Sequence, residues 1–162
     1  MSRKRADDLK QVLQNLHANG HLKGWEIIDI DGVGPEEVAG VMKKSKIFLS
    51  GASREGFGLP AAEAMACGCV VIGYHGIGGK EYFDAKVGFP IEENNLLDFL
   101  TTSTEVVQNI NKDFTCYDDL SRLAAKEIKE KYSMEKESEL IISSFLEVSK
   151  GLLSLDNRQN QS

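Results

Sequence analysis

Several kinds of residue are scarce in this sequence, and each scarcity excludes a class of protein. Three cysteines among 162 residues are too few, and odd in number, for the disulfide framework of a small secreted domain. No apolar run approaches the roughly 20 residues of a membrane span, and the N-terminus lacks the apolar core of a signal peptide. Basic residues are not in excess, since the formal net charge is -6, which disfavours nucleic acid as a partner. We therefore expect a cytoplasmic protein without a membrane span.

The length and the pattern of apolar residues predict one α/β domain. Helical and strand patterns alternate along the chain, as in a parallel sheet with helices on its faces. The segments expected to be strands are WEIIDI (25–30), KIFLS (46–50), CVVIG (69–73) and VGFPI (87–91). The segments expected to be helices are 6–19, 35–44 and most of the chain from about residue 94 to residue 148. Because the chain opens with a helix, the first strand of such a sheet is expected to be missing.

The segment REGFGLPAAEAMACG (54–68) has the features of a phosphate site. It follows an expected strand, and ligands of open parallel sheets bind outside the carboxyl ends of the strands. Gly56 and Gly58 let the backbone approach a ligand, and Pro60 is suited to the first turn of a helix. The free N–H groups at such a helix start attract anions.

Two carboxylates beside a phosphate site need an explanation, because like charges repel. An ionised carboxylate accepts hydrogen bonds from hydroxyl groups, so Glu63, expected in the first helical turn, could bind a ribose and Glu55 a sugar ring. Together these groups describe a nucleotide-sugar. The simpler interpretations are that Glu63 only stabilises a helix start and that the glycines only form a turn. A glycoside hydrolase, the other enzyme with paired carboxylates, fits less well because the phosphate site indicates a phosphate leaving group.

The longer stretch EGFGLPAAEAMACGCVVIGYHGIGGKEYF resembles the signature of the group 1 (family 4) glycosyltransferases, whose motif is Glu, seven residues, Glu, as in Glu55 and Glu63. The similarity extends to the helix ending in MACG, the VVI strand and the second glycine-rich loop, HGIGGKE. It implies the C-terminal, donor-binding domain of the GT-B fold: a single Rossmann-like domain over residues 1–150 with a mostly helical C-terminal part. The polar residues 151–162 are expected to form a mobile tail.

The resemblance also implies roles for individual residues. Glu55 is the candidate catalytic residue, which stabilises positive charge on the transferred sugar, and Glu63 binds the ribose hydroxyls. The residues that the resemblance assigns to donor binding are Gly56, Phe57, Gly58, Leu59, Glu63, Gly78, Gly79, Arg3 and Arg5. Arg3 and Arg5 are expected in a basic loop. Transfer with retention of configuration is implied, with a nucleotide-sugar as substrate and no cofactor or metal ion.

The chain has about half the length of these relatives, and no acceptor-binding domain is recognisable in it. It is expected to be a fragment, a truncated gene product, or a subunit that works with a second polypeptide. The alternative to an enzyme is a non-catalytic module for nucleotide-sugar binding or assembly.

Three further features are weaker candidates. Asp29 and Asp31 imitate a metal-binding Asp-x-Asp pair, but a lone pair on an expected strand is a weak motif. His75 could reach the donor or be an ordinary loop histidine. Cys67 and Cys69 are expected to be small packing residues.

Overall fold

Three parallel strands form the centre of the fold in the computed structural model, which describes residues 3–30, 34–51 and 59–132. The strands are β1 (Ile47–Gly51), β2 (Val70–Tyr74) and β3 (Phe89–Ile91). The helices are α1 (Arg3–Ala18), α2 (Pro35–Lys44), α3 (Leu59–Ala66), the short 3-10 helix η1 (Gly78–Glu81), α4 (Leu96–Lys112) and α5 (Asp118–Lys131). This alternation is a Rossmann-like α/β fold, as the sequence predicts.

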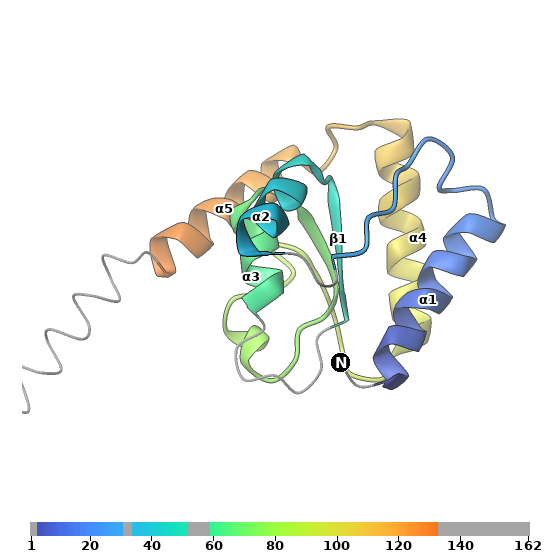
Figure 1. The fold of residues 1–162 in the computed structure, drawn as a ribbon, viewed down its shortest axis with the longest axis horizontal. Coiled ribbons are helices and arrows are strands. Elements are labelled where there is room, and N and C mark those ends of the chain that lie inside the picture. Colours follow the sequence, from blue (N-terminus) through green and yellow to red (C-terminus); the bar gives the residue numbers. More distant parts are fainter. Residues whose placement is uncertain (1–2, 31–33, 52–58, 133–162) are drawn as a thin grey trace, which may run out of the picture. The chain divides into compact units, whose positions relative to one another are not determined.

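The strand order is β1-β2-β3, so β2 lies in the middle of the described sheet. The register pairs Ile47 with Val70 and, further along, Ile72 with Phe89. Helices α1 and α4 lie on one face of the sheet, and α2 and α3 lie on the other (Figure 1). Because both faces are covered, every residue of β2 is buried, which explains its uninterrupted apolar sequence.

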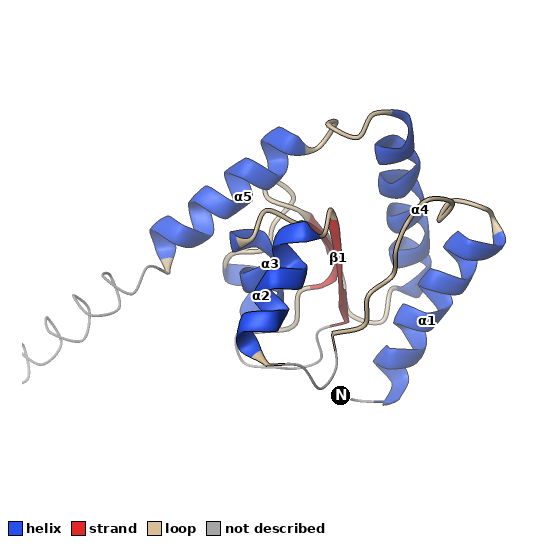
Figure 2. Ribbon diagram, turned by 45° about the horizontal axis from the view of Figure 1, so that its top comes forward, coloured by secondary structure: helices blue, strands red, loops and turns tan. Residues whose placement is uncertain are grey.

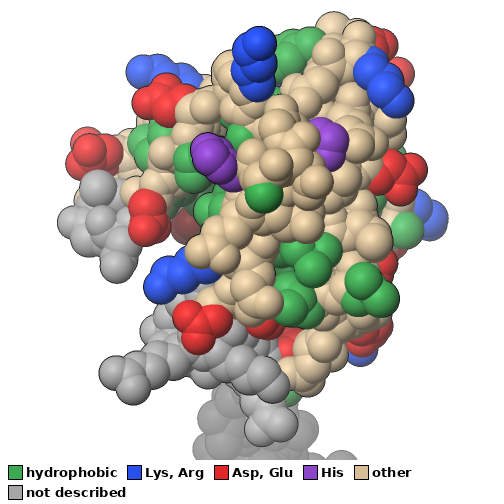
Figure 3. Space-filling model, turned by 90° about the vertical axis from the view of Figure 1, so that its right-hand side faces the viewer, with side chains coloured by type: hydrophobic (Ala, Val, Ile, Leu, Met, Phe, Trp, Pro, Cys, Tyr) green, Lys and Arg blue, Asp and Glu red, His purple; other side chains and the backbone are tan. Residues whose placement is uncertain are grey.

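The main core lies between the sheet and the helices α1 and α4. These helices present apolar residues at helical spacing, so that one side of each faces the strands. The buried members of this cluster are Val12, Leu16, Val70, Ile72, Tyr74, Ile91, Phe99, Val106, Val107 and Ile110. The outer side of α1 and α4 is turned to the viewer in Figure 3, where acidic and basic side chains lie mostly around the margin and hydrophobic ones gather in the lower half. Among the described residues of this face, neither sign of charge dominates.

The expected strand over residues 25–30 is wrong. These residues form an extended connection without strand pairing, which passes close to β1 (Figures 1 and 2). Trp25 packs against the core and its Nε1 donates a hydrogen bond to Asn111 Oδ1 at 2.7 Å, whereas Ile27 and Ile28 are 53% and 47% exposed. Since these isoleucines find no buried position, the segment does not gain the burial that a strand in the sheet would have.

The other expected strands and the helices up to residue 132 are confirmed, with ends shifted by a few residues. Within the described residues, no strand precedes Ile47, in agreement with the expected lack of a first strand. The chain divides into a unit over Met1–Ile128 and a second over Lys129–Ser162, of which only the first four residues are described. The helix expected over 134–148, the domain end at residue 150 and the tail at 151–162 lie outside the described residues. No described helix is both long and apolar enough to cross a membrane.

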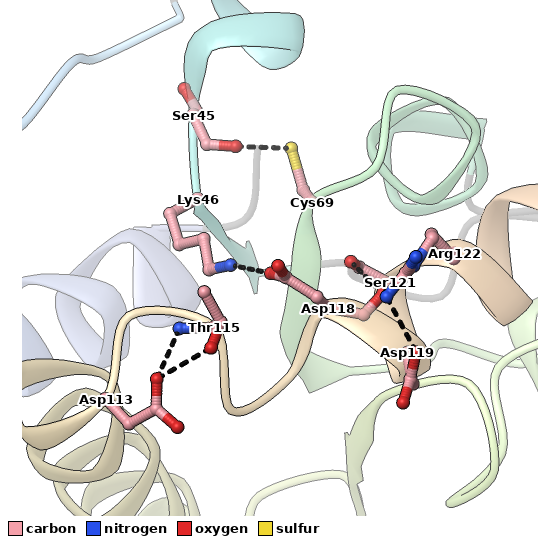
Figure 4. A network of polar contacts seen from close by, with 9 residues as sticks. All are labelled: Ser45, Lys46, Cys69, Asp113, Thr115, Asp118, Asp119, Ser121 and Arg122. Carbon is pink, nitrogen blue, oxygen red and sulfur yellow. Dashed lines mark hydrogen bonds and ion pairs between the residues drawn. The ribbon is translucent and has the colours of Figure 1, made fainter.

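The amino ends of β1 and β2 are held by a polar network (Figure 4). Lys46, directly before β1, forms an ion pair of 2.5 Å with Asp118 at the start of α5. Before β2, the thiol of Cys69 donates a hydrogen bond to the backbone oxygen of Met42 at 3.1 Å. Nearby, hydrogen bonds from the hydroxyl and backbone N–H of Thr115 hold the pKa of Asp113 below its usual value. The network keeps Lys46 and Cys69 at the end of the sheet opposite the candidate site.

Candidate functional site

The carboxyl ends of all three strands lie at one edge of the sheet, because the strands are parallel. β1 ends at Gly51, β2 at Tyr74 and β3 at Ile91. This edge is where ligands of open parallel sheets bind. β1 leads to α3, β2 to the second glycine-rich loop, and β3 to the charged residue Glu92. These parts make up the candidate site.

Helix α3, which begins at this edge, carries Glu63. The helix is short and rich in alanine, so that Ala61, Ala62 and Ala64 are buried close to the strands while Glu63 and Leu59, one turn apart, are exposed. The sequence predicted Glu63 in the first turn, and this is wrong: α3 begins at Leu59, so Glu63 opens the second turn. Helical side chains lean towards the N-terminus, so a residue at this position still covers the first turn.

Four predicted site residues lie outside the described residues. They are Glu55, Gly56, Phe57 and Gly58, which belong to the segment between β1 and α3. Leu59, the first residue of α3, is described and is exposed. The described elements on either side are β1, which ends at Gly51, and α3, which begins at Leu59.

The second glycine-rich loop follows β2 and contains the predicted residues Gly78 and Gly79 in η1. Gly76 precedes them with a φ of 64°, a left-handed conformation that glycine adopts without strain. A Cβ at Gly79 would lie 3.4 Å from the Cβ of His75, which is an ordinary van der Waals contact. Glycine is thus favoured in this loop by the backbone conformation at Gly76.

His75 links this loop to the end of β3. Its side chain is only 5% exposed, Nδ1 lies 2.6 Å from the backbone oxygen of Gly76, and Nε2 lies 3.5 Å from Glu92 Oε1. The other carboxylate oxygen of Glu92 lies 3.5 Å from the ammonium of Lys80 in η1. The charge of Lys80, followed by the hydrogen bond from His75, holds the pKa of the exposed Glu92 carboxyl below its usual value. The three side chains therefore form one charged cluster beside the glycine loop.

Arg3 and Arg5 lie in the first turns of α1, not in a loop. The expected loop is absent because the helical pattern of α1 extends to the first described residue. This end of α1 lies at the carboxyl edge, since the hydroxyl of Tyr74 at the end of β2 donates a hydrogen bond of 3.0 Å to Asp8 Oδ2 (Figure 1). The two arginines thus belong to the end of α1 that lies at the carboxyl edge, and they are in a helix where a loop was expected.

The sequence reasoning missed Lys80 and Glu92 and gave His75 only a weak role. A signal existed for Glu92, because it follows β3 directly, as a ligand-facing residue at the carboxyl edge would. No local pattern could pair it with His75, since the two residues come from different strand ends. Asp29, of the weak metal-binding pair, lies on the connection before α2, and Asp31 is outside the described residues.

The described part of the site combines a helix start, a glycine loop and an exposed carboxylate at one edge. Free N–H groups at a helix start and in a glycine loop suit the oxygens of a phosphate, and the carboxylate of Glu63 suits hydroxyl donors. The arrangement can therefore receive a ligand that carries both phosphate and hydroxyl groups.

Comparison with known proteins identifies the family. The family described as "Glycosyl transferases group 1" matches residues 6–114, which is more than half of the chain. An "Alpha-1,6-glucosyltransferase" of Actinobacillus pleuropneumoniae serotype 7 (strain AP76) is 41% identical over 85 residues, covering 51% of this chain and 25% of the relative. A "Putative glycosyltransferase 48" of Sulfolobus islandicus filamentous virus is 29% identical over 123 residues, covering 67% of this chain and 38% of the relative. The matches thus span less than half of either relative. The family match covers the strands, the glycine loop and α3. The chain therefore belongs to the group 1 glycosyltransferases.

Proposed function

We propose that this chain is the donor-binding half of a retaining glycosyltransferase, which binds a nucleotide-sugar at the carboxyl edge of its sheet. The proposal rests most on Glu63, an exposed carboxylate that α3 carries at this edge while the alanines beside it are buried. The family supports sugar transfer in general, and the name of the relative from Actinobacillus makes glucosyl donors the first to test.

Each part of the donor has a proposed partner. Glu63 accepts hydrogen bonds from the ribose hydroxyls, and the start of α3 at Leu59 together with the loop containing Gly78 and Gly79 faces the diphosphate. Glu55 stabilises the positive charge that develops on the sugar as the nucleoside diphosphate departs. With these groups and the basic Arg3 and Arg5, the proposed reaction needs neither a metal ion nor a cofactor.

The acceptor is proposed to bind to polypeptide other than the described residues. The matches cover only 25% and 38% of the two relatives, which leaves most of each relative for other tasks. In the proposed arrangement, a second domain or a second polypeptide closes over the carboxyl edge and completes the site for the acceptor.

The first experiment is thermal unfolding of the purified chain with a panel of nucleoside diphosphates and their glucose conjugates at millimolar concentration. A ligand that binds only the folded state stabilises it by RT ln(1 + [L]/Kd), which is about 2.7 kcal/mol at one hundred times Kd. We expect one base to raise the unfolding temperature, and Glu63→Ala to abolish the shift. Glu105→Ala, which removes an exposed carboxylate from the middle of α4, is the matched control and should keep the full shift. A folded chain that responds to no ligand, or that responds equally with Glu63→Ala, contradicts the proposed donor site.

A non-catalytic binding or assembly module is the second candidate, and the edge of β1, which has no described strand partner, favours it. The backbone oxygen of Lys46 accepts a hydrogen bond from Val70, so the alternate residues Ile47 and Leu49 direct their backbone groups away from β2. No described strand pairs with them there, and edges of this kind accept further strands. Donor binding without donor hydrolysis or transfer, combined with a concentration-dependent change in mass, would favour this candidate.

A further inference from the structure

The buried His75 joins two loops at the carboxyl edge, and the proposed reaction has not used it. Its Nδ1 lies 2.6 Å from the oxygen of Gly76 within the glycine loop, and its Nε2 lies 3.5 Å from Glu92 after β3. A buried histidine whose two nitrogens each lie beside an oxygen differs from an ordinary loop histidine, which would be free to rotate in water. Its contacts therefore fix both the ring and the two segments that it joins.

The partner of Nδ1 determines where the first proton lies. A backbone carbonyl only accepts hydrogen bonds, so Nδ1 carries a proton and donates it to Gly76. In the neutral ring Nε2 then has a lone pair, which faces the carboxylate of Glu92 without attraction. In the imidazolium form Nε2 carries a proton too, and it pairs with Glu92. The link between the loops is complete only in the protonated form.

The side chain of His75 lies among residues of the glycine loop and of a charged cluster. The Cβ of His75 lies 3.4 Å from where a Cβ would stand at Gly79, and the Tyr82 hydroxyl lies 3.8 Å from the same point. The charged groups among the described residues that share the cluster are Glu92 and Lys80. A change in the His75 ring is thus transmitted to Gly76 through a hydrogen bond.

We propose that His75 is a positioning residue, which holds the second glycine loop in its donor-binding shape by donating to the Gly76 carbonyl and, when protonated, to Glu92. The consequence for the donor rests on the proposed function, whereas the link between the loops does not. Lys80 acts in the same cluster as a second cation on Glu92, so that the carboxylate stays ionised and available to His75. Loop order and donor affinity are then both higher when His75 is charged than when it is neutral.

The test measures two quantities on the full chain at pH 6 and pH 8. The first is hydrogen exchange of the backbone amides of residues 76–82, corrected for the intrinsic effect of pH on exchange. The second is the affinity for the nucleoside diphosphate that stabilises the protein most. We expect both protection and affinity to fall about two- to fivefold from pH 6 to pH 8, the range for one partly exposed ion pair.

Two variants separate positioning from simple packing. Glu92→Gln changes an exposed side chain and leaves the ring of His75 in place, so it should fold normally and lose the dependence on pH. His75→Gln keeps an amide donor for Gly76 but carries no charge, and it should show faster loop exchange at pH 6 with no dependence on pH. Glu105→Gln, remote on α4, is the control with a matched loss of charge and should behave as the unmodified chain does.

The outcomes distinguish the two proposals. If hydrogen exchange of the loop depends on pH in Glu92→Gln as it does in the unmodified chain, the proposed role of His75 is overturned, whether or not nucleotides bind. Loop exchange that changes as expected, in a chain that binds no nucleotide, supports the link made by His75 and overturns the donor function instead. Donor binding with unchanged loop exchange in His75→Gln overturns the positioning role and leaves the donor function intact.

Discussion

The hydroxyl of Tyr74 donates a hydrogen bond of 3.0 Å to Asp8 Oδ2, and this bond joins the last residue of β2 to the second turn of α1. Both side chains are buried, with 1% of Tyr74 and 8% of Asp8 exposed. The ring of Tyr74 also packs edge to face on Phe99 of α4, at 5.2 Å between centroids. Tyr74 therefore fixes α1 and α4 against the strand that leads into His75 and the glycine loop.

Tyr74→Phe should lower the free energy of unfolding by about 1–3 kcal/mol. The ring remains packed, but the buried carboxylate of Asp8 loses a donor, and an unsatisfied buried group costs about this much. Urea denaturation measures the change. Asp8→Asn should also destabilise the protein, whereas Asp7→Asn, at the exposed neighbouring position, should change stability by less than about 0.5 kcal/mol. Equal effects of the two aspartate variants would contradict this role for the bond.

Gly73→Ala should be among the most damaging single substitutions in the chain. Gly73 has a φ of 134°, and a Cβ there would overlap the backbone oxygen of Ser50 and lie 3.0 Å from Phe99 Cζ. Because backbone atoms of β1 cannot yield easily, we expect a loss of more than about 3 kcal/mol, or no folded protein. Soluble yield and urea denaturation test this.

The matched control for Gly73→Ala is Gly40→Ala. Gly40 lies inside α2, and nothing would come within 4 Å of a Cβ there. Alanine is favoured over glycine in a helix by up to about 1 kcal/mol, so this variant should be more stable than the unmodified chain. A destabilised Gly40→Ala together with a tolerated Gly73→Ala would show that the packing around β2 differs from the one described.

Local signals in the sequence were sufficient for most of the fold. Pro35 at the start of α2 and Lys44 at its end marked the helix, and the short apolar runs marked the three strands, because these patterns follow from the geometry of a single element. Residues 25–30 have an equally apolar pattern but no strand pairing. An apolar run alone does not show whether a neighbouring strand is there to pair with it.

The candidate site could be predicted only where its parts are close in sequence. The order of elements alone led us to expect a strand before the glycine segment and a helix after it, and β1 does end at Gly51 and α3 begin at Leu59. Glu63 lies on α3, but in its second turn and not in the first. The cluster of His75, Lys80 and Glu92 depends on how the ends of β2 and β3 lie in space. That relationship comes from sheet order and register, which a short motif does not contain.

Lys46→Gln should destabilise the protein more than Arg122→Gln does. Lys46 is only 16% exposed, pairs with Asp118 at 2.5 Å and places its ammonium 4.7 Å from the centre of the Phe114 ring. The pair of Arg122 with Asp119 is largely exposed, and such pairs contribute about 0–1 kcal/mol. We expect a loss of about 1 kcal/mol for Lys46→Gln in urea denaturation, because it removes a partly buried ion pair together with the contact between the ammonium and the Phe114 ring. Indistinguishable losses in the two variants would mean that burial adds nothing to the Lys46 pair.

The thiols of Cys69 and Cys116 should react at very different rates. Burial, and secondarily the neighbouring Cys67, raise the pKa of the Cys69 thiol from 9.0 to about 12, whereas Cys116 is exposed. Since the thiolate is the reactive form, an alkylating reagent at pH 8 should modify Cys116 first and Cys69 only after unfolding. Mass spectrometry of the peptides at successive times measures the order. Modification of Cys69 in the folded chain as fast as that of Cys116 would contradict its burial.

The same thiol should make the fold less stable in alkali. The folded state keeps the Cys69 proton up to about pH 12, whereas the unfolded chain releases it near pH 9, so stability is lost as the pH rises between these values. The loss attributable to Cys69 is at most about 1.4 kcal/mol per pH unit. We expect Cys69→Ala to show a correspondingly smaller fall in the free energy of unfolding from pH 9 to pH 10, even if it is less stable at pH 7 because it lacks the hydrogen bond to Met42. Cys116→Ala, which removes an exposed thiol, should keep the full loss of stability in alkali. If the free energy of unfolding falls with pH as steeply in Cys69→Ala as in Cys116→Ala, the Cys69 thiol is not the cause of the loss.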